Sequence, residues 1–449
     1  MKKFITFTLC LLLCVVTFGL VGCGKKDKDV VDTSIATNGN GGSVVTRGDY
    51  IYFVNGYKTF EVFNKDNLRT DFNVGGLYRV KLNDNNELDY NNESLTNAEK
   101  ISGNLAGFEN TSLYVFGNTI YYATPITEVD KEGRLQNTKI EFKRVSISGG
   151  KSESIYKAGV ESANTKFEFY YANGGVYLLV NENGILNRVE CFGEFNTSQV
   201  ATDVKTVVMP RDTDDVFASD SYKNIYYTKT NSDGKTEIYN YNVLTNTNQY
   251  KKTTDFKTLE LLEVKFGHLY FKASGNDAPS YTYFYRVDAT ENAVRNMAIE
   301  KLTSDKDYTG IYLLENETDG FIAQTSNKTY YLAYNAGEEG TPIVVDNSKL
   351  EIIAVQDGYI YVKSSTDIKR INIYDLKTSG IATQQSVITI EGLQAYACDI
   401  DSNNLYVYAT KGSNTYLYSI RLSGLVEGES FEQRLLGMYE SADAPKVED

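Results

Sequence analysis

Apolar and polar residues alternate along most of this chain, in short runs that end at Gly, Asn or Asp. Within this pattern an aliphatic residue followed by Tyr recurs at intervals of 44 to 69 residues, with one interval of 91. A degenerate copy, Phe321-Ile322, divides that long interval, so we count eight copies. The seven complete pairs are Ile51-Tyr52, Ile120-Tyr121, Val176-Tyr177, Ile225-Tyr226, Leu269-Tyr270, Ile360-Tyr361 and Leu405-Tyr406. Such a repeat indicates one supersecondary unit per copy.

Each copy predicts four strands. A turn such as Arg47-Gly48-Asp49 precedes the pair, because Gly, Asn and Asp accept the positive φ of tight hairpin turns. An apolar stretch such as Leu350–Val355 lies before the turn, and a strand such as Ser152–Tyr156 ends the unit. After the pair, alternation with a period of two predicts a half-exposed third strand. These third strands are expected at residues 77–82, 142–147, 283–287, 368–374 and 416–422.

Four antiparallel strands in a unit of about 40–50 residues are the layout of a β-propeller blade. We therefore predict an all-β fold, a β-propeller over residues 43–437, with eight four-stranded blades favoured over seven. Two β-sandwiches sharing the chain are the alternative, but they would not give one pattern throughout. No helical periodicity competes with the strands in this region. We expect the repeated Tyr to pack between blades, with its hydroxyl at a polar edge.

The first 22 residues have the layout of a secretory signal, with Lys2 and Lys3 before an uncharged apolar run, Phe4–Leu20. The run is short for a membrane span, which needs about 20 residues. It ends in Leu20-Val21-Gly22-Cys23, which resembles the lipobox of bacterial lipoproteins. In that family the Cys receives a diacylglyceryl group and becomes the first residue after cleavage.

The resemblance implies that residues 1–22 are a lipoprotein signal peptide, cleaved between Gly22 and Cys23. It also implies that Cys23 is lipidated and anchors an extracytoplasmic protein to the bacterial cell membrane, since two acyl chains hold a protein stably. An ordinary signal with an unrelated Cys, or a short uncleaved anchor, are the alternatives. We expect residues 23–42 to be the lipidated Cys and a flexible tether, and residues 438–449 to be an acidic tail.

Charge and composition exclude several classes of function. The chain has 449 residues and a formal net charge of −14, which disfavours a nucleic-acid partner. It contains one His and no Trp, so a His-rich metal site is excluded and no metal or cofactor is predicted. The single His268 lies in a predicted turn, where a structural role is expected.

The remaining chemistry-bearing residues give no recognisable active site. Cys191 and Cys398 are far apart in sequence, and we expect two separate buried thiols. Residues 399–403 have the oxygen spacing of a calcium loop, but Asn404 and Thr410 replace its Gly and closing Glu, so a turn is predicted. Other acidic clusters, at residues 84–86 and 212–215, match no metal-binding pattern.

The repeated units resemble those of propeller-containing lipoproteins of bacterial envelopes. Tyr226-Tyr227-Thr228 resembles the Tyr-Trp-Thr-Asp signature of the low-density-lipoprotein-receptor propellers, although Lys229 replaces the Asp. This resemblance is one of architecture and implies no particular function.

Two hypotheses of function follow. The first is a membrane-anchored, monomeric, non-enzymatic binding or scaffold module for an envelope protein, peptide or glycan. The second is a carboxylate-based hydrolase or lyase acting at the mouth of the propeller channel, with catalytic residues unknown, because propellers host both kinds of protein. Acids converging with Arg or Tyr at a channel mouth would favour the enzyme.

Overall fold

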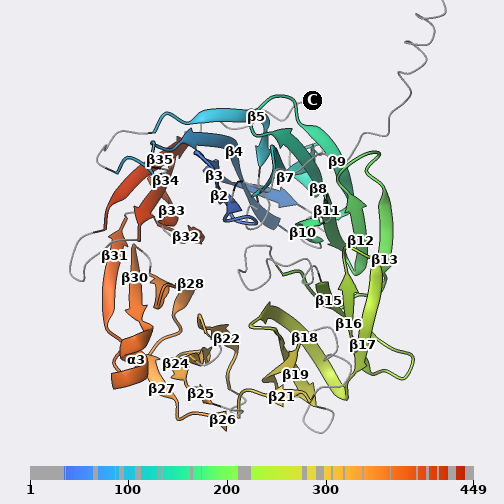
Figure 1. The fold of residues 1–449 in the computed structure, drawn as a ribbon, viewed down its shortest axis with the longest axis vertical. Helices are drawn as coiled ribbons and strands as arrows, with labels where there is room; N and C mark the ends of the chain where they lie inside the picture. Colours follow the sequence, from blue (N-terminus) through green and yellow to red (C-terminus); the bar gives the residue numbers. More distant parts are fainter. Residues whose placement is uncertain are drawn as a thin grey trace, which may run out of the picture.

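The computed structural model describes residue 35 and residues 37–439, apart from gaps within the second range. These gaps are residues 64–68, 86, 91–95, 107–112, 130, 133–134, 162–164, 173, 211–223, 276–280, 290–297, 305–306, 317–318, 336–337, 365, 391–392, 401–403, 412–413 and 423–430. Figure 1 shows the sheets following one another around a ring in chain order. The structure is a β-propeller of eight four-stranded antiparallel blades, as the sequence predicted.

Each blade takes its four strands from the chain in sequence order, from the inside of the ring outwards. The strands of blades 1 and 2 are β2 (Val44–Arg47), β3 (Tyr50–Phe63), β4 (Arg69–Lys81), β5 (Glu99–Ala106), β6 (Leu113–Phe116), β7 (Thr119–Val129), β8 (Leu135–Ser146) and β9 (Glu153–Glu161). Those of blades 3 and 4 are β10 (Thr165–Ala172), β11 (Gly175–Glu182), β12 (Ile185–Glu190), β13 (Thr197–Ala201), β14 (Val207–Val208), β15 (Asn224–Thr230), β16 (Thr236–Asn242) and β17 (Thr247–Thr253).

The second half of the ring is built in the same way. The strands of blades 5 and 6 are β18 (Phe256–Lys265), β19 (His268–Gly275), β20 (Tyr283–Asp288), β21 (Glu300–Lys301), β22 (Gly310–Leu313), β23 (Phe321–Gln324), β24 (Thr329–Leu332) and β27 (Ile343–Asp346). Those of blades 7 and 8 are β28 (Glu351–Gln356), β29 (Tyr359–Lys363), β30 (Asp367–Asn372), β31 (Gln384–Thr389), β32 (Leu393–Ile400), β33 (Asn404–Lys411), β34 (Asn414–Arg421) and β35 (Gln433–Tyr439).

The aliphatic–Tyr pair lies on the second strand of its blade and joins two adjacent seams. Ile51 packs with Tyr406 and Leu436 of blade 8, whereas Tyr52 packs with Val115 of blade 2. Neighbouring residues of a strand point to opposite faces, so one pair contributes to the core on both sides of its blade. The other copies repeat this arrangement, and eight hydrophobic clusters fill the eight seams.

The first and last blades meet without exchanging a strand. Tyr408 of β33 donates a hydrogen bond to the carbonyl oxygen of Val54 on β3, at 2.6 Å. The Asn55 amide donates to the carbonyl oxygen of Met438 on β35, at 3.2 Å. Packing and a few hydrogen bonds therefore close the ring, shown in Figure 1 where the red strands meet the blue ones.

One predicted strand is longer than the observed one. The third strand of blade 7 ends at Asn372, and residues 373–374, predicted as strand, begin the short helix α3 (Ile373–Ser379). The Asn372 side chain accepts hydrogen bonds from the backbone amides of Tyr374 and Asp375, which caps the helix, and Gly380 ends it at φ 70°. A hairpin of β25 (Tyr334–Asn335) and β26 (Glu338–Glu339) also precedes the fourth strand of blade 6.

Residues 37–42, predicted as part of a flexible tether, belong to the folded ring. They include β1 (Thr37–Asn38), which pairs antiparallel with β2. Asn40 is buried, and its side chain bonds to both the backbone amide and the carbonyl of Val115 in blade 2. The tether prediction overlooked these non-local contacts because Gly- and Asn-rich sequence has no hydrophobic period.

Candidate functional site

The predicted site residues are dispersed. Gly22 and Cys23 lie outside the described residues, as do residues 212–215 and 401–403. Cys191 is buried and forms no disulfide, as predicted, and burial raises the pKa of its thiol. The side chain of Cys398 is outside the described part. His268 begins β19 beside the turn at Gly267, with its Nδ1 3.0 Å from the carbonyl oxygen of Phe266.

A cross-strand row of Tyr, Arg and Glu recurs in the blades, and the sequence analysis missed it. In blade 2, Tyr121 on the second strand lies opposite Arg144 on the third, which lies opposite Glu153 on the fourth. The Arg144 guanidinium contacts the Glu153 carboxylate at 2.8 Å. The corresponding Arg residues of other blades are Arg79 with Glu99, Arg286 with Glu300, and Arg370 with Gln385. An Arg followed by Val or Ile on the third strands of blades 1, 2, 5 and 7 is the signal that could have revealed the row.

Two of these Arg residues, and Arg188 of blade 3, also bond to the next blade. Arg79 donates to the carbonyl oxygen of Ile147 and Arg144 to that of Cys191, both at 2.9 Å. Arg188 donates to the carbonyl oxygen of Val243 at 3.0 Å. Each acceptor is the residue directly after the third strand of the following blade. These cations therefore hold neighbouring blades together, a structural role.

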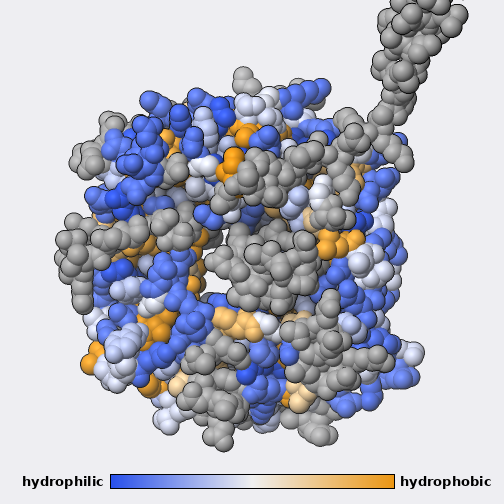
Figure 2. All heavy atoms as spheres, in the orientation of Figure 1, coloured by the Kyte–Doolittle hydropathy of each residue, from blue (hydrophilic) through white to orange (hydrophobic). Residues whose placement is uncertain are grey.

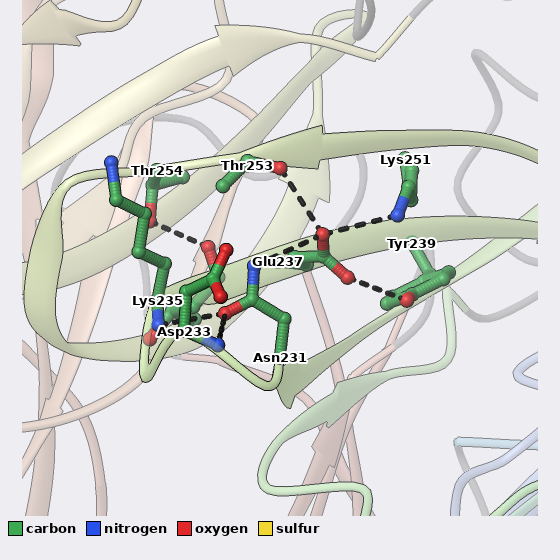
Figure 3. Close-up of polar contacts among 9 residues, drawn as sticks. Asn231, Asp233, Lys235, Glu237, Tyr239, Lys251, Thr253 and Thr254 are labelled. Atoms are coloured by element: carbon green, nitrogen blue, oxygen red, sulfur yellow. Dashed lines mark hydrogen bonds and ion pairs between the residues drawn. The ribbon is translucent and has the colours of Figure 1, made fainter.

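Glu237 on β16 is a carboxylate with several hydrogen-bond donors. As Figure 3 shows, it accepts hydrogen bonds from Tyr239 at 2.7 Å, Lys251 and Thr253 at 3.1 Å, and Asn231 at 3.4 Å. The Tyr239 hydroxyl and the other donors outweigh burial and lower the pKa of Glu237. Burial and the adjacent carboxylate raise the pKa of Tyr239 to about 12. An acid stabilised as its anion in this way suits a structural role better than proton transfer.

Two other buried acids are held by Tyr. Tyr114 of blade 2 donates to Glu168 of blade 3 at 2.6 Å. Tyr156 and the backbone amide of Gly159 donate to Glu182. Each bond joins adjacent blades, so these carboxylates also contribute to the seams.

One recess is lined by residues on the inner strands of blades 5, 6 and 7. We call it the channel pocket, a cavity of about 190 Å³. Its lining residues are Glu263, Lys265, Ile311, Tyr312, Leu313, Ile352, Ile353, Ala354 and Val355. Seven of these nine are apolar or aromatic. In Figure 2 apolar residues border the central opening near the position of β22.

Bulges shape two of the strands that form the channel pocket. Leu262 is an extra residue in β18, between Leu261 and Glu263, and Ile353 is an extra residue in β28. A bulge bends its strand and redirects the following side chains. It therefore sets the direction of Glu263 on β18 and of Ala354 on β28, both of which line the pocket.

An acidic group lies next to one end of the pocket. Glu315, two residues beyond Leu313, accepts a hydrogen bond from the Gly358 amide at 2.7 Å. Burial is the main cause that raises the pKa of Glu315, and the charges of Asp357 and Asp319 add to it, while Lys265 opposes them. Asp319 is itself paired with Lys377.

A second recess, of about 580 Å³, lies between blades 3 and 4, and most of its lining residues are polar or charged. Its residues come from the turn after β11 and from the connection to blade 4, and they include Lys166, Asn181, Ile185, Asp203 and Lys205. Ile185 is 43% exposed. The mixed charges of this recess do not single out one ligand class.

Within the described ranges, no group of three or more His, Cys, Asp or Glu residues is arranged to hold a metal ion. The same part of the chain contains no helix with the length and apolarity of a membrane span.

Comparisons with known proteins found β-propeller structures and no related sequence. No family model and no curated protein sequence matches the chain. Among solved structures, it is similar to the β-propeller domain of the trilobed protease from Pyrococcus furiosus, with 9% identity, a TM-score of 0.40, and coverage of 71% of this chain and 94% of that chain. It is also similar to BamB from Moraxella catarrhalis, with 12% identity, a TM-score of 0.39, and coverage of 72% and 93%. These values carry no functional argument.

Proposed function

We propose that the protein is a lipid-anchored, extracytoplasmic lipoprotein of the bacterial cell envelope whose propeller is a non-enzymatic binding module. The channel pocket is the observation that carries the proposal. Seven of its nine lining residues are apolar or aromatic, three blades contribute to it, and Glu263 and Lys265 add charge, a combination found in binding sites. An envelope protein, peptide or glycan is the class of ligand.

The distribution of charged side chains supports binding over catalysis. Glu168, Glu182 and Glu237 are committed to hydrogen bonds within or between blades. The Arg residues of the cross-strand rows are likewise committed to neighbouring acids and carbonyls. Such groups stabilise the ring, and moving a proton on any of them would weaken it.

Membrane attachment rests on the lipobox resemblance. We expect the wild-type protein, expressed in a bacterium, to sediment with membranes and to incorporate radiolabelled palmitate. Cys23→Ala should remove the label and release the protein from a lipid anchor, because the acylated thiol is lost. Cys191→Ala is the matched control and should keep the label. A Cys23→Ala protein that stays quantitatively in the membrane would contradict the anchor.

The binding function is tested with the chain from Gly24 onwards, which contains every described residue. It would be immobilised and exposed to envelope extract, and separately incubated with glycan and peptide libraries. A specifically retained envelope component supports the proposal. Retention of nothing, together with turnover of a library member, would overturn it.

A carboxylate-based hydrolase or lyase remains the second candidate, favoured by Glu315. Its raised pKa and its position beside the pocket are features of a general acid. If this candidate is correct, Glu315→Gln abolishes turnover of a library substrate, while Glu87→Gln, an exposed control, leaves it unchanged. Absence of turnover by the wild type removes the candidate.

A further inference from the structure

The inner strand of each blade has one edge that faces the centre of the ring, and in blades 1 and 2 the chain covers this edge itself. β1 pairs with β2 through Thr37 opposite Arg47. Farther along, the amide of Gly41 donates to the carbonyl of Leu113 in β6 at 2.7 Å, and the Leu113 amide donates to Gly42 at 2.8 Å. Residues 37–38 thus add a two-residue strand to β2, and the turn that follows, with positive φ at Gly39 and Gly41, bonds to Leu113 at the start of β6.

The inner strands β2 and β6 are more buried than β28. All four residues of β6 are buried, as are three of the four in β2. In β28, the inner strand of blade 7, Glu351 is exposed, the other five residues are half-buried, and none is buried. Four of those five, Ile352 to Val355, are apolar and line the channel pocket. Among the described strands, β28 pairs only with β29, so its inner side is an apolar sheet edge with no neighbouring strand there.

We propose that an extended peptide segment of a partner protein pairs along the inner edge of β28 and inserts an apolar side chain into the channel pocket. This inference rests on the proposed binding function. An exposed sheet edge offers unpaired backbone groups, and strand addition at such an edge is a known mode of peptide recognition. The chain's own β1, paired with β2, shows that an inner edge of this ring accepts a short added strand.

The size of the pocket and the charges around it define the partner segment. A volume of about 190 Å³ is comparable with an engineered cavity of about 150 Å³ that holds benzene, so one aromatic or branched side chain fits. Glu263 and Lys265 line the pocket, and Lys265 also interacts electrostatically with Glu315, whose other charged neighbours include Asp357. A basic residue next to the inserted side chain therefore complements the site. A β-strand alternates its side chains, so the segment combines apolar residues at every second position with a Lys or Arg.

The test uses the full-length protein and a displayed library of random nine-residue peptides. Selection on wild type should enrich alternating apolar sequences that contain Lys or Arg. The best peptide, made synthetically, should bind Val355→Lys at least tenfold more weakly, because that change places a charge in the pocket wall. Ile185→Lys, in the recess between blades 3 and 4, is the matched control and should bind normally. Circular dichroism checks that each variant is folded.

Two further measurements keep the proposal falsifiable if Val355→Lys does not fold. Glu315→Gln should weaken binding of the Lys-containing peptide, but not of its norleucine analogue. N-methylation of alternate backbone amides of the peptide should abolish binding, because it blocks strand pairing. Equal binding by these forms, or no enriched peptide, would overturn the inference.

The result also separates this inference from the proposed function. An envelope partner that binds wild type and Val355→Lys equally would leave the binding function standing and remove β28 as its site. Self-association that Val355→Lys abolishes would identify the occupant as a second copy of this chain. A glycan whose binding is lost in Val355→Lys would identify a sugar ligand. Either of the last two results would overturn the peptide proposal.

Discussion

A Tyr on the second strand of seven blades packs its ring into the seam with the next blade. Tyr226, for example, lies in the cluster that joins blades 4 and 5, and its hydroxyl donates to the carbonyl oxygen of Ala289 at 2.7 Å. Asn240 lies opposite it on β16, where blades 1, 2, 5 and 7 have Arg. In blade 4 the Tyr hydroxyl thus makes the bond to the next blade that Arg makes elsewhere.

Substitution of Tyr226 separates the contributions of its ring and its hydroxyl. Tyr226→Ala should lower the free energy of unfolding by about 3–5 kcal/mol, as for other large buried side chains. Tyr226→Phe should lower it by about 1–3 kcal/mol, because the Ala289 carbonyl loses its donor. Denaturant unfolding measures both. Tyr374→Ala is the control, since Tyr374 is 70% exposed and its loss should change little.

Glu237 makes stability depend on pH. Its pKa is lower in the folded state than in the unfolded state, so the folded protein favours the anion. This contribution is fully present above the unfolded pKa of about 4.3 and is lost as the pH falls through the lower folded value. Glu237→Gln should therefore destabilise the protein at pH 7 by about 1–3 kcal/mol. The difference from wild type should shrink below about pH 4. A difference independent of pH between 3 and 7 would contradict this role.

At the scale of strands, the sequence correctly predicted the features that depend on local residue pattern. The position of each second strand, the turn before it and the third strands of most blades follow from alternation and turn residues. The irregular spacing of the first copies reflects longer strands, since β3 has 14 residues and β4 has 13.

The elements that the sequence analysis missed depend on local capping or on distant partners. The helix α3 forms because Asn372 caps its start and Gly380, in a left-handed conformation, ends it. The apolar alternation that predicted a strand there covers only a few residues. Residues 37–42 become ordered through blade 2, about 75 residues farther along. The Tyr–Arg–Glu rows and the channel pocket require the register of neighbouring strands and blades, which no single strand encodes.

At the scale of the whole molecule, the ring closes through packing between blades 8 and 1, without a shared strand. Such a closure relies on contacts between residues of the last blade and residues of the first blade, such as Tyr408 with Val54. The segment 37–42 adds a second link, because it joins the inner edges of blades 1 and 2. The stability of the first two blades should therefore depend on residues that precede the propeller repeat.

Asn40 is the residue of this segment through which that dependence is best tested. Its side chain accepts a hydrogen bond from the Val115 amide at 2.7 Å and donates one to the Val115 carbonyl at 3.3 Å, so Asn40→Ala leaves two buried backbone groups without partners. The expected loss in the free energy of unfolding is about 1–3 kcal/mol for each buried group left unsatisfied.

Hydrogen exchange should also quicken at β2 and β6, whose inner edges the segment covers, and stay unchanged at β28. Asn38→Ala is the matched control, because Asn38 is exposed and its strand pairing uses backbone atoms only. Equal effects of the two substitutions would show that residues 37–42 act as a passive tether.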